Sequence, residues 1–230
     1  MRKEKLASGN IFLKIGLFVF LALIILPVTH VKADDTICVD NKFKKTVVYS
    51  KDDKKYGYIF SMSGLYADSL EQVKIKSSNK SVATVKPISR GAFQLYPKKA
   101  GTTRITITAV MNNKKVKKTG TVKVVNFQNP FKNLKVGGKN YLSKVKGSYN
   151  YLVIKTKKAN VKLNYKLNST WKIADAHAYG TEQISNIGGT TAAKNGMNYA
   201  LKEGETLMIY LELKNKKNGV EIGTWLHIMR

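Results

Sequence analysis

The chain has 230 residues, of which 41 are Lys or Arg and 14 are Asp or Glu, so its formal net charge is +27. This excess of cations argues against an ordinary acidic cytosolic enzyme. Hydrophobic residues make up 43% of the chain, which is enough to build a core and argues against intrinsic disorder. Because there is only one cysteine, a disulfide framework and a cysteine-based zinc module are excluded.

Residues 1–33 are typical of a secretory signal peptide, because four cations within the first 14 residues precede an apolar run at residues 15–28 and Ala33 closes the segment. Fourteen helical residues span about 21 Å, less than the roughly 30 Å of a membrane core, so we expect cleavage after Ala33. The alternative is an uncleaved anchor, through which the protein would contact the membrane. In either case the rest of the chain is expected to be secreted or to lie at the cell surface.

Cys38 lies shortly after the expected cleavage site. The residues before it, Asp35-Thr36-Ile37, differ from the small apolar residues that precede a lipid-modified cysteine in bacterial lipoproteins, so lipidation is disfavoured. We expect an inert thiol in a flexible leader, and a reactive thiol or an intermolecular disulfide is the alternative.

From Thr46 onward, short runs rich in Val, Ile, Thr and Tyr alternate with clusters of Gly, Asn, Ser and Lys, which is typical of an all-β protein. Residues 104–109 and 161–167 alternate apolar and polar side chains, so each predicted strand has one buried and one wet face. Residues 206–213 and 220–228 are predicted to form a hairpin. A helical turn is expected only at residues 68–73, where Asp68 and Glu71 have the spacing of a capping box.

A module boundary is predicted near residues 126–131, where a valine-rich run ends at polar residues and Pro130. It separates a module at residues 34–126 from a second module at residues 127–230.

The first module contains the turn Ser77-Ser78-Asn79, the strand Val82-Ala83-Thr84-Val85 and the turn Ala100-Gly101-Thr102 before Ile105-Thr106-Ile107. This order resembles the bacterial immunoglobulin-like domain, group 2, over about residues 44–125. The resemblance implies an immunoglobulin-like fold in a secreted or surface protein of Gram-positive type, acting as a spacer or binding module without a catalytic site. Because the second module has similar strand spacing, we expect two consecutive immunoglobulin-like β-sandwich domains after the signal segment.

Lysines gather at the predicted turns and strand ends. The candidate contacts for an anionic cell-wall polymer or glycan are Lys98, Lys99, Lys114, Lys115, Lys117, Lys118, Lys157 and Lys158. A positive field attracts polyanions, and salt screens it over about 8–10 Å. The alternative is that these lysines keep the strands soluble and protect sheet edges. Nucleic acid is not an expected partner.

Aromatic side chains of the second module are enough to form a platform on which sugar rings stack. They are Trp171, Trp225, Tyr149, Tyr151, Tyr165 and Tyr210. Trp225 shares a strand face with Glu221, Gly223 and His227, which favours the polar side of the sheet and makes Trp225 a further candidate contact. The alternative is that the tryptophans belong to the core.

Asp175 and His177 are two residues apart, so in a strand both side chains lie on one face, as a base and its orienting group require. No Gly-x-Ser-x-Gly motif supplies a nucleophile, and Cys38 is distant. We therefore expect a non-enzymatic protein that either binds a partner at the bacterial envelope or acts there as a spacer. The alternative is an accessory domain or enzyme that acts on cell-wall polymer through His177 and Asp175.

Asp52 and Asp53 are flanked by lysines, so they are expected to form a solvated turn and not a calcium site. The sequence predicts no metal ligand, no catalytic residue and no cofactor.

Overall fold

The computed structural model describes residues 37–39, 42–53, 57–62, 70–89, 92–180 and 191–230. Within these ranges the regular structure is β-strand, apart from one 3-10 turn, η2, at Leu142–Lys144. None of the described residues belongs to a helix that is long and apolar enough to cross a membrane. The predicted signal peptide lies outside the described residues.

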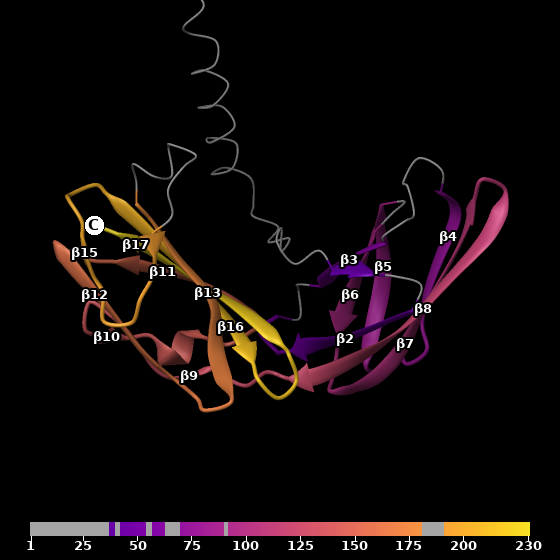
Figure 1. Cartoon of the computed structure of the whole chain (residues 1–230), viewed down its shortest axis with the longest axis horizontal. Helices are drawn as coiled ribbons and strands as arrows, with labels where there is room; N and C mark the ends of the chain where they lie inside the picture. The colour runs from indigo at the N-terminus through magenta and orange to yellow at the C-terminus, as the bar shows by residue number, and fades with distance from the viewer. Residues whose placement is uncertain (1–36, 40–41, 54–56, 63–69, 90–91, 181–190) are drawn as a thin grey trace, which may run out of the picture.

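The N-terminal half forms two four-stranded sheets with the orders β1-β3-β6-β5 and β2-β8-β7-β4 (Figure 1). Phe60, Phe93 and Leu95 of the first sheet pack with Ile105 and Val122 of the second, and all five are fully buried. The strands are β1 (Ile37–Val39), β2 (Lys42–Tyr49), β3 (Tyr58–Met62), β4 (Leu70–Ser77), β5 (Ala83–Ser89), β6 (Ala92–Pro97), β7 (Gly101–Met111) and β8 (Lys114–Asn126).

The C-terminal half forms a second sandwich, from sheets with the orders β10-β9-β12-β15 and β11-β17-β16-β13-β14. Leu134 and Leu163 of the first sheet belong to the same buried cluster as Ile209, Leu211 and Leu226 of the second. The strands are β9 (Phe131–Val136), β10 (Lys139–Asn140), β11 (Tyr149–Lys155), β12 (Asn160–Leu167), β13 (Trp171–Gly180), β14 (Thr191–Ala192), β15 (Asn198–Ala200), β16 (Thr206–Asn215) and β17 (Glu221–Met229).

The two sandwiches share one strand order. In each, an early strand runs parallel to the last strand, β2 beside β8 and β11 beside β17, and the other pairs of that sheet are antiparallel. The sheets β2-β8-β7-β4 and β11-β17-β16-β13 therefore correspond strand for strand. Two facing sheets with this connectivity form an immunoglobulin-like sandwich. The all-β prediction and the prediction of two such sandwiches are confirmed.

The predicted strand periodicities are also confirmed. Ile105 and Ile107 are buried between the exposed Arg104 and half-exposed threonines, and Val161 and Leu163 are buried on either side of an exposed lysine. The predicted hairpin is formed by β16 and β17, and Gly219 in its turn has a φ of +70°.

The helical turn predicted at residues 68–73 is wrong. Leu70 begins strand β4, which pairs with β7, and the register shifts between Glu71 and Lys74. Gln72 has a φ of +49°, so this segment is a β-bulge. Pairing with a long neighbouring strand outweighs a local capping pattern, since it satisfies the backbone donors and acceptors of the segment. Residues 63–69 lie outside the described residues.

Cys38 also departs from the expectation of a flexible leader. It lies in the short strand β1, opposite Ser61 of β3.

The turn that carries the family resemblance is held by a buried threonine. The Oγ1 atom of Thr103 lies 2.8 Å from the Ser77 hydroxyl and accepts a hydrogen bond from the backbone N–H of Asn79 at 3.0 Å. At the second turn, Gly101 has a φ of +151°, and a Cβ there would lie 2.7 Å from Val82. Only glycine fits at this position.

Residues 127–130 connect β8 to β9, and direct contacts also join the two sandwiches. Val48 faces away from the core of its own sandwich, yet it is only 2% exposed because it belongs to the buried cluster of the second. The Ser50 hydroxyl donates to the carbonyl of Lys146 at 2.6 Å. Asp53 Oδ2 accepts hydrogen bonds from the hydroxyl (2.8 Å) and the backbone N–H (2.5 Å) of Ser148.

The prediction of a solvated turn at Asp52 and Asp53 is therefore wrong for Asp53. Its carboxylate binds the second sandwich, a partner that lies 95 residues further along the chain. A contact over that separation has no local signature in the sequence.

Candidate functional site

The outer face of the sheet β11-β17-β16-β13-β14 carries rings where the wet face of a sheet normally carries polar side chains. On β17, the buried Leu226 and Ile228 alternate with Trp225 and His227, which point outward. The same alternation turns the rings of β11, β16 and β13 outward. We call this surface the aromatic face, and it consists of Tyr149, Tyr151, His177, Tyr179, Tyr210, Trp225 and His227.

Strand pairing aligns these residues in rows across the sheet. One row consists of His177, Tyr210, Trp225 and Tyr151, at directly paired positions of β13, β16, β17 and β11. The next row consists of Tyr179, Met208, His227 and Val153. Since neighbouring strands lie about 4.8 Å apart, each row of four extends over about 14 Å.

Trp225 is at the centre of the ring contacts. Its ring centroid lies 4.6 Å from that of Tyr210, at an interplanar angle of 34°, and 6.3 Å from that of Tyr179, at 28°. Gly223 lies two residues before Trp225, and a Cβ there would meet the Tyr210 ring at 3.3 Å and the Tyr149 ring at 3.6 Å. The glycine therefore leaves room for the tyrosine rings beside Trp225.

His227 and Tyr151 form a hydrogen-bonded pair on adjacent strands, with 2.7 Å between the Tyr151 hydroxyl and His227 Nδ1. Burial lowers the pKa of His227 and raises the pKa of Tyr151, since it disfavours the charged form of each group. The imidazole is therefore mostly neutral at pH 7, and one hydrogen bond joins its Nδ1 to the Tyr151 hydroxyl. The pair holds the Tyr151 ring in place at the edge of the sheet.

His177 Nε2 lies 2.6 Å from Asp175 Oδ2, and the side chains of the two residues are about one third and one half exposed. The predicted proximity of these residues is confirmed. The residues paired with them across the sheet are Glu212, Tyr210 and Ala192. The geometry gives an oriented imidazole beside a carboxylate, which suits hydrogen bonds to hydroxyl groups.

The aromatic face is open to solvent and carries little net charge. Tyr151 and Val153 at its β11 edge are 40% and 53% exposed, which is high for large apolar side chains. Asp175 and Glu212 border it, and the Lys214 ammonium donates to the Glu221 carboxylate at 2.6 Å in the next row. The surface therefore suits a ligand that is neutral or weakly charged.

The structure brings together four of the six aromatic residues that the sequence analysis named. Tyr149, Tyr151, Tyr210 and Trp225 lie on the aromatic face, and Trp225 shares its strand face with His227 as predicted. Trp171 is 5% exposed and belongs to the core. Tyr165 lies on β12 of the opposite sheet, with its ring edge-on to Phe131 at 6.2 Å.

Tyr179 was not predicted from the sequence as part of this surface. The spacing of two that joins Asp175 to His177 continues to Tyr179 and could have found it, because all three lie on one face of β13 after its bulge.

The predicted lysines do not form one patch. Lys98 and Lys99 lie before β7, whereas Lys114, Lys115 and Lys117 lie at the start of β8, at the opposite end of the β7–β8 hairpin. Because β7 has 11 residues, these two groups are about 34 Å apart.

Three other predicted lysines are placed differently. Lys157 and Lys158 lie between β11 and β12 in the second sandwich, and the Lys158 ammonium donates to the Gly137 carbonyl at 2.6 Å. Lys118 is only 6% exposed, because the alternation of β8 places it on the inner face with Val122. Little of Lys118 is therefore available to a ligand, contrary to what its place in a lysine-rich run suggested.

Among the described residues, no group of three or more His, Cys, Asp and Glu lies close enough together to hold a metal ion.

No protein-family model matches the chain, and no curated protein sequence matches it. Solved structures that it resembles include the tandem Ig repeats of Dlar, with 13% identity, coverage of 84% of this chain and 97% of that chain, and a TM-score of 0.34. The fibronectin(III)-like modules of Clostridium thermocellum CbhA have 11% identity, coverage of 85% and 91%, and a TM-score of 0.31. A chimeric titin Z1Z2 has 11% identity, coverage of 81% and 92%, and a TM-score of 0.29. With TM-scores this low, the likenesses say nothing about function, and the strand order alone identifies the fold.

Proposed function

We propose that the protein is an exported, non-catalytic pair of immunoglobulin-like modules, the first of the bacterial group 2 type, that binds a glycan of a Gram-positive-type envelope through the aromatic face. The aromatic face itself is the observation that carries this proposal. Seven ring-bearing residues share one solvent-facing sheet surface, where they add nothing to the core beneath. The signal-like residues 1–33 support export.

The chemistry of the surface fits a sugar chain. The apolar faces of sugar rings stack on Trp225 and on the tyrosines around it. The imidazole and carboxylate of His177 and Asp175, at one end of the Trp225 row, hydrogen-bond sugar hydroxyls. The low net charge of the face favours neutral glycan over a polyanion at this site.

The exposed lysines have a less specific part in this function. They form three separate groups, so together they raise the positive field around the protein and draw it toward an anionic envelope. The groups are Lys98 with Lys99, Lys114 with Lys115 and Lys117, and Lys157 with Lys158. This attraction weakens as salt rises, because the charges are exposed.

Titration with soluble glycan strands from bacterial cell wall, followed by Trp fluorescence and calorimetry, tests the proposal. Trp225→Ala is expected to weaken binding about tenfold, which is about 1.4 kcal/mol, because it removes the central stacking ring. Tyr96→Ala is the control, since it removes a half-buried aromatic ring from the first sandwich. Equal affinities of the wild type and Trp225→Ala would refute the aromatic face as the site.

A hydrolytic function through His177 and Asp175 is the second candidate, and their 2.6 Å contact is the observation that favours it. Incubation of the protein with cell-wall polymer, with new reducing ends as the readout, separates the two functions. We expect no release above background. Release by the wild type that His177→Ala abolishes would establish the enzyme instead.

A further inference from the structure

The outer face of the sheet β2-β8-β7-β4 carries an ordered array of cations. Alternation along each strand turns them away from the core, and every one of them is exposed. We call this surface the cationic face, and it consists of Lys42, Lys44, Lys74, Lys76, Arg104, Lys115, Lys117 and Lys123. Of these residues, the sequence analysis named only Lys115 and Lys117.

Strand pairing places threonines between the cations. Lys42 and Lys76 close the two ends of a row whose middle positions are Thr119 and Thr106. In the next row along the sheet, Thr108 lies between Lys117 and Lys74. Residues two apart in a strand are separated by about 6.8 Å, so charges and hydroxyl groups repeat regularly over the sheet.

The described residues supply no acidic partner for the charge of this face. None of the eight cations forms an ion pair with a described acidic residue. The acidic residue found at the paired positions of the face is Glu71, at the far end of β4. The cationic face thus differs from the aromatic face, where acidic residues border the rings.

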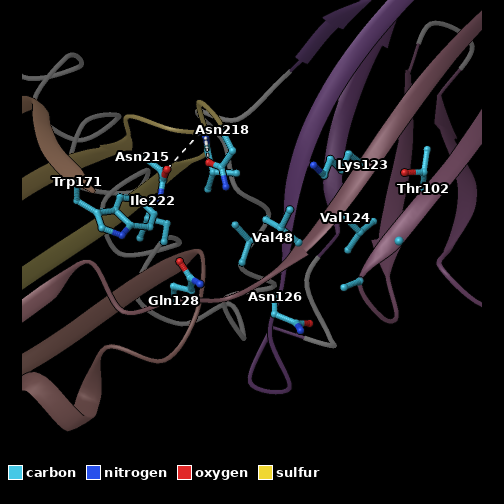
Figure 2. A pocket seen from close by; sticks show the side chains of 14 residues that line it. Val48, Thr102, Lys123, Val124, Asn126, Gln128, Trp171, Asn215, Asn218 and Ile222 are labelled. Atoms are coloured by element: carbon cyan, nitrogen blue, oxygen red, sulfur yellow. Dashed lines mark hydrogen bonds between the residues drawn. The ribbon is translucent and has the colours of Figure 1, made fainter. Parts of the chain in front are cut away.

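The cationic face continues into a cleft of about 440 Å³ between the two sandwiches (Figure 2). Lys123 of the cationic face lines the cleft together with Thr102, which is paired with it across the sheet. The amide side chains of Asn126, Gln128 and Asn218 line it further along. No Asp or Glu is among the lining residues. Amide groups both donate and accept hydrogen bonds, so they suit a neutral unit that carries hydroxyl groups.

We propose that the cationic face and this cleft bind a linear phosphodiester polymer whose repeating unit is a polyol or sugar. Lysines and threonine hydroxyls contact successive phosphates along the sheet, and the amides of the cleft contact a hydroxyl-bearing unit. Seven of the eight cations are lysines, which act as point charges, whereas a densely sulfated polysaccharide is better matched by clustered arginine forks. The paired positions of the face hold no aromatic residue on which nucleic-acid bases could stack.

This site rests on the proposed function only in taking its ligand from the envelope, since its cations lie on the other sandwich from the aromatic face. The probe is synthetic poly(glycerol phosphate), with its dissociation constant measured for the full chain over a series of salt concentrations. The combined substitution Lys42→Gln, Lys44→Gln and Lys76→Gln is expected to weaken binding at least tenfold. It should also lower the slope of log affinity against log salt by about 2, at about 0.7 per charge for a single-stranded polymer.

The matched control is a second triple variant, which removes three exposed lysines from the second sandwich: Lys162→Gln, Lys166→Gln and Lys202→Gln. We expect this control to lose less than threefold in affinity. Gln128→Ala is expected to weaken binding severalfold without changing the salt slope, since it removes an uncharged group from the cleft. Equal losses in the two triple variants would overturn the proposal, because net charge alone would then explain the binding.

Heparin and single-stranded DNA distinguish the ligand classes. Binding of either that is as tight as that of poly(glycerol phosphate) overturns the assignment to a polyol phosphodiester. Trp225→Ala is expected to leave polymer binding unchanged. If the wild-type protein binds glycan strands but not poly(glycerol phosphate), this site alone is refuted. If it binds poly(glycerol phosphate) but not glycan strands, the proposed function alone is refuted.

Discussion

His227 shows how a single residue can make the aromatic face sensitive to pH. Its ring lies edge-on to Tyr151, with 5.9 Å between the centroids, and its Nδ1 forms a hydrogen bond with the Tyr151 hydroxyl. Protonation would place a positive charge on a ring that is partly buried. Burial therefore lowers the pKa of His227.

Acid is therefore expected to destabilise the folded protein through His227. Its pKa is lower in the folded than in the unfolded state, so its contribution is fully present above about pH 6.5 and is lost as pH falls below that value. We expect the free energy of unfolding in urea to fall more between pH 7.5 and 5.5 for the wild type than for His227→Gln. The variant keeps every other titratable group, so parallel pH profiles would contradict this role. The difference should be small, because the ring is partly exposed.

In the β7–β8 hairpin, the two residues of the turn determine the register in which the strands pair. Asn112 and Asn113 have φ values of +51° and +60°, which are the two left-handed residues of a type I′ turn. This turn fixes the register that pairs Met111 with Lys114, and every row of the cationic face depends on the same register.

The effect of substituting Asn113 on the free energy of unfolding is expected to depend on the residue that replaces it. Asn113→Gly should leave the free energy of unfolding unchanged or raise it slightly, because glycine adopts a positive φ without strain. Asn113→Val should lower it by about 1–2 kcal/mol, since a β-branched residue is disfavoured in that conformation. Urea denaturation of the pair measures the difference. An Asn113→Val variant as stable as Asn113→Gly would show that the turn does not determine the hairpin.

Individual strands could be predicted from the sequence, but the surfaces they form could not. Alternation in residues 104–109 and 161–167 predicted strands with one buried face, because a period of two leaves its mark in a few consecutive residues. The bulge at Gln72 left no such mark, since it depends on pairing with β7. Lys42 and Lys76 are 34 residues apart and share a row only because β8 and β7 lie between their strands.

The candidate site was predictable to the same extent. Trp225 was placed on the polar side of its strand from its neighbours in sequence. Its contacts with Tyr210 and Tyr179 follow from the order of β17, β16 and β13 within one sheet. One sequence does not specify that order, because several strand orders bury the same apolar faces.

At the scale of the molecule, the joint between the sandwiches fixes the cationic face relative to the aromatic face. Asp53 of the first sandwich binds Ser148, which directly precedes β11 of the sheet that carries the rings. Gly147 lies against the Asp53 carboxylate, and a Cβ there would come within 2.1 Å of Oδ1. Val48 adds an apolar contact to these polar ones.

Asp53→Ala is expected to loosen this joint without unfolding either sandwich. It removes two hydrogen bonds to a charged acceptor and should cost about 2–3 kcal/mol of coupling between the sandwiches. Small-angle X-ray scattering should then show a wider distribution of overall dimensions, and calorimetry should show two transitions further apart. Asp52→Ala is the control. It removes a carboxylate of the same charge from the neighbouring residue, which is exposed. Identical scattering curves for the two variants would rule out Asp53 as a determinant of the joint.

The parallel pairing of an early and a last strand in each sandwich has a mechanical consequence. Tension that reaches β2 and β8 pulls these strands past one another in shear, so the hydrogen bonds along their eight paired positions bear the load together. The chain enters the second sandwich through β9, and the seven paired positions of β11 and β17 share the load in the same way once tension reaches β11. Antiparallel strands pulled from one end would instead unzip bond by bond. This architecture resists extension without a disulfide inside the chain, which has only one cysteine.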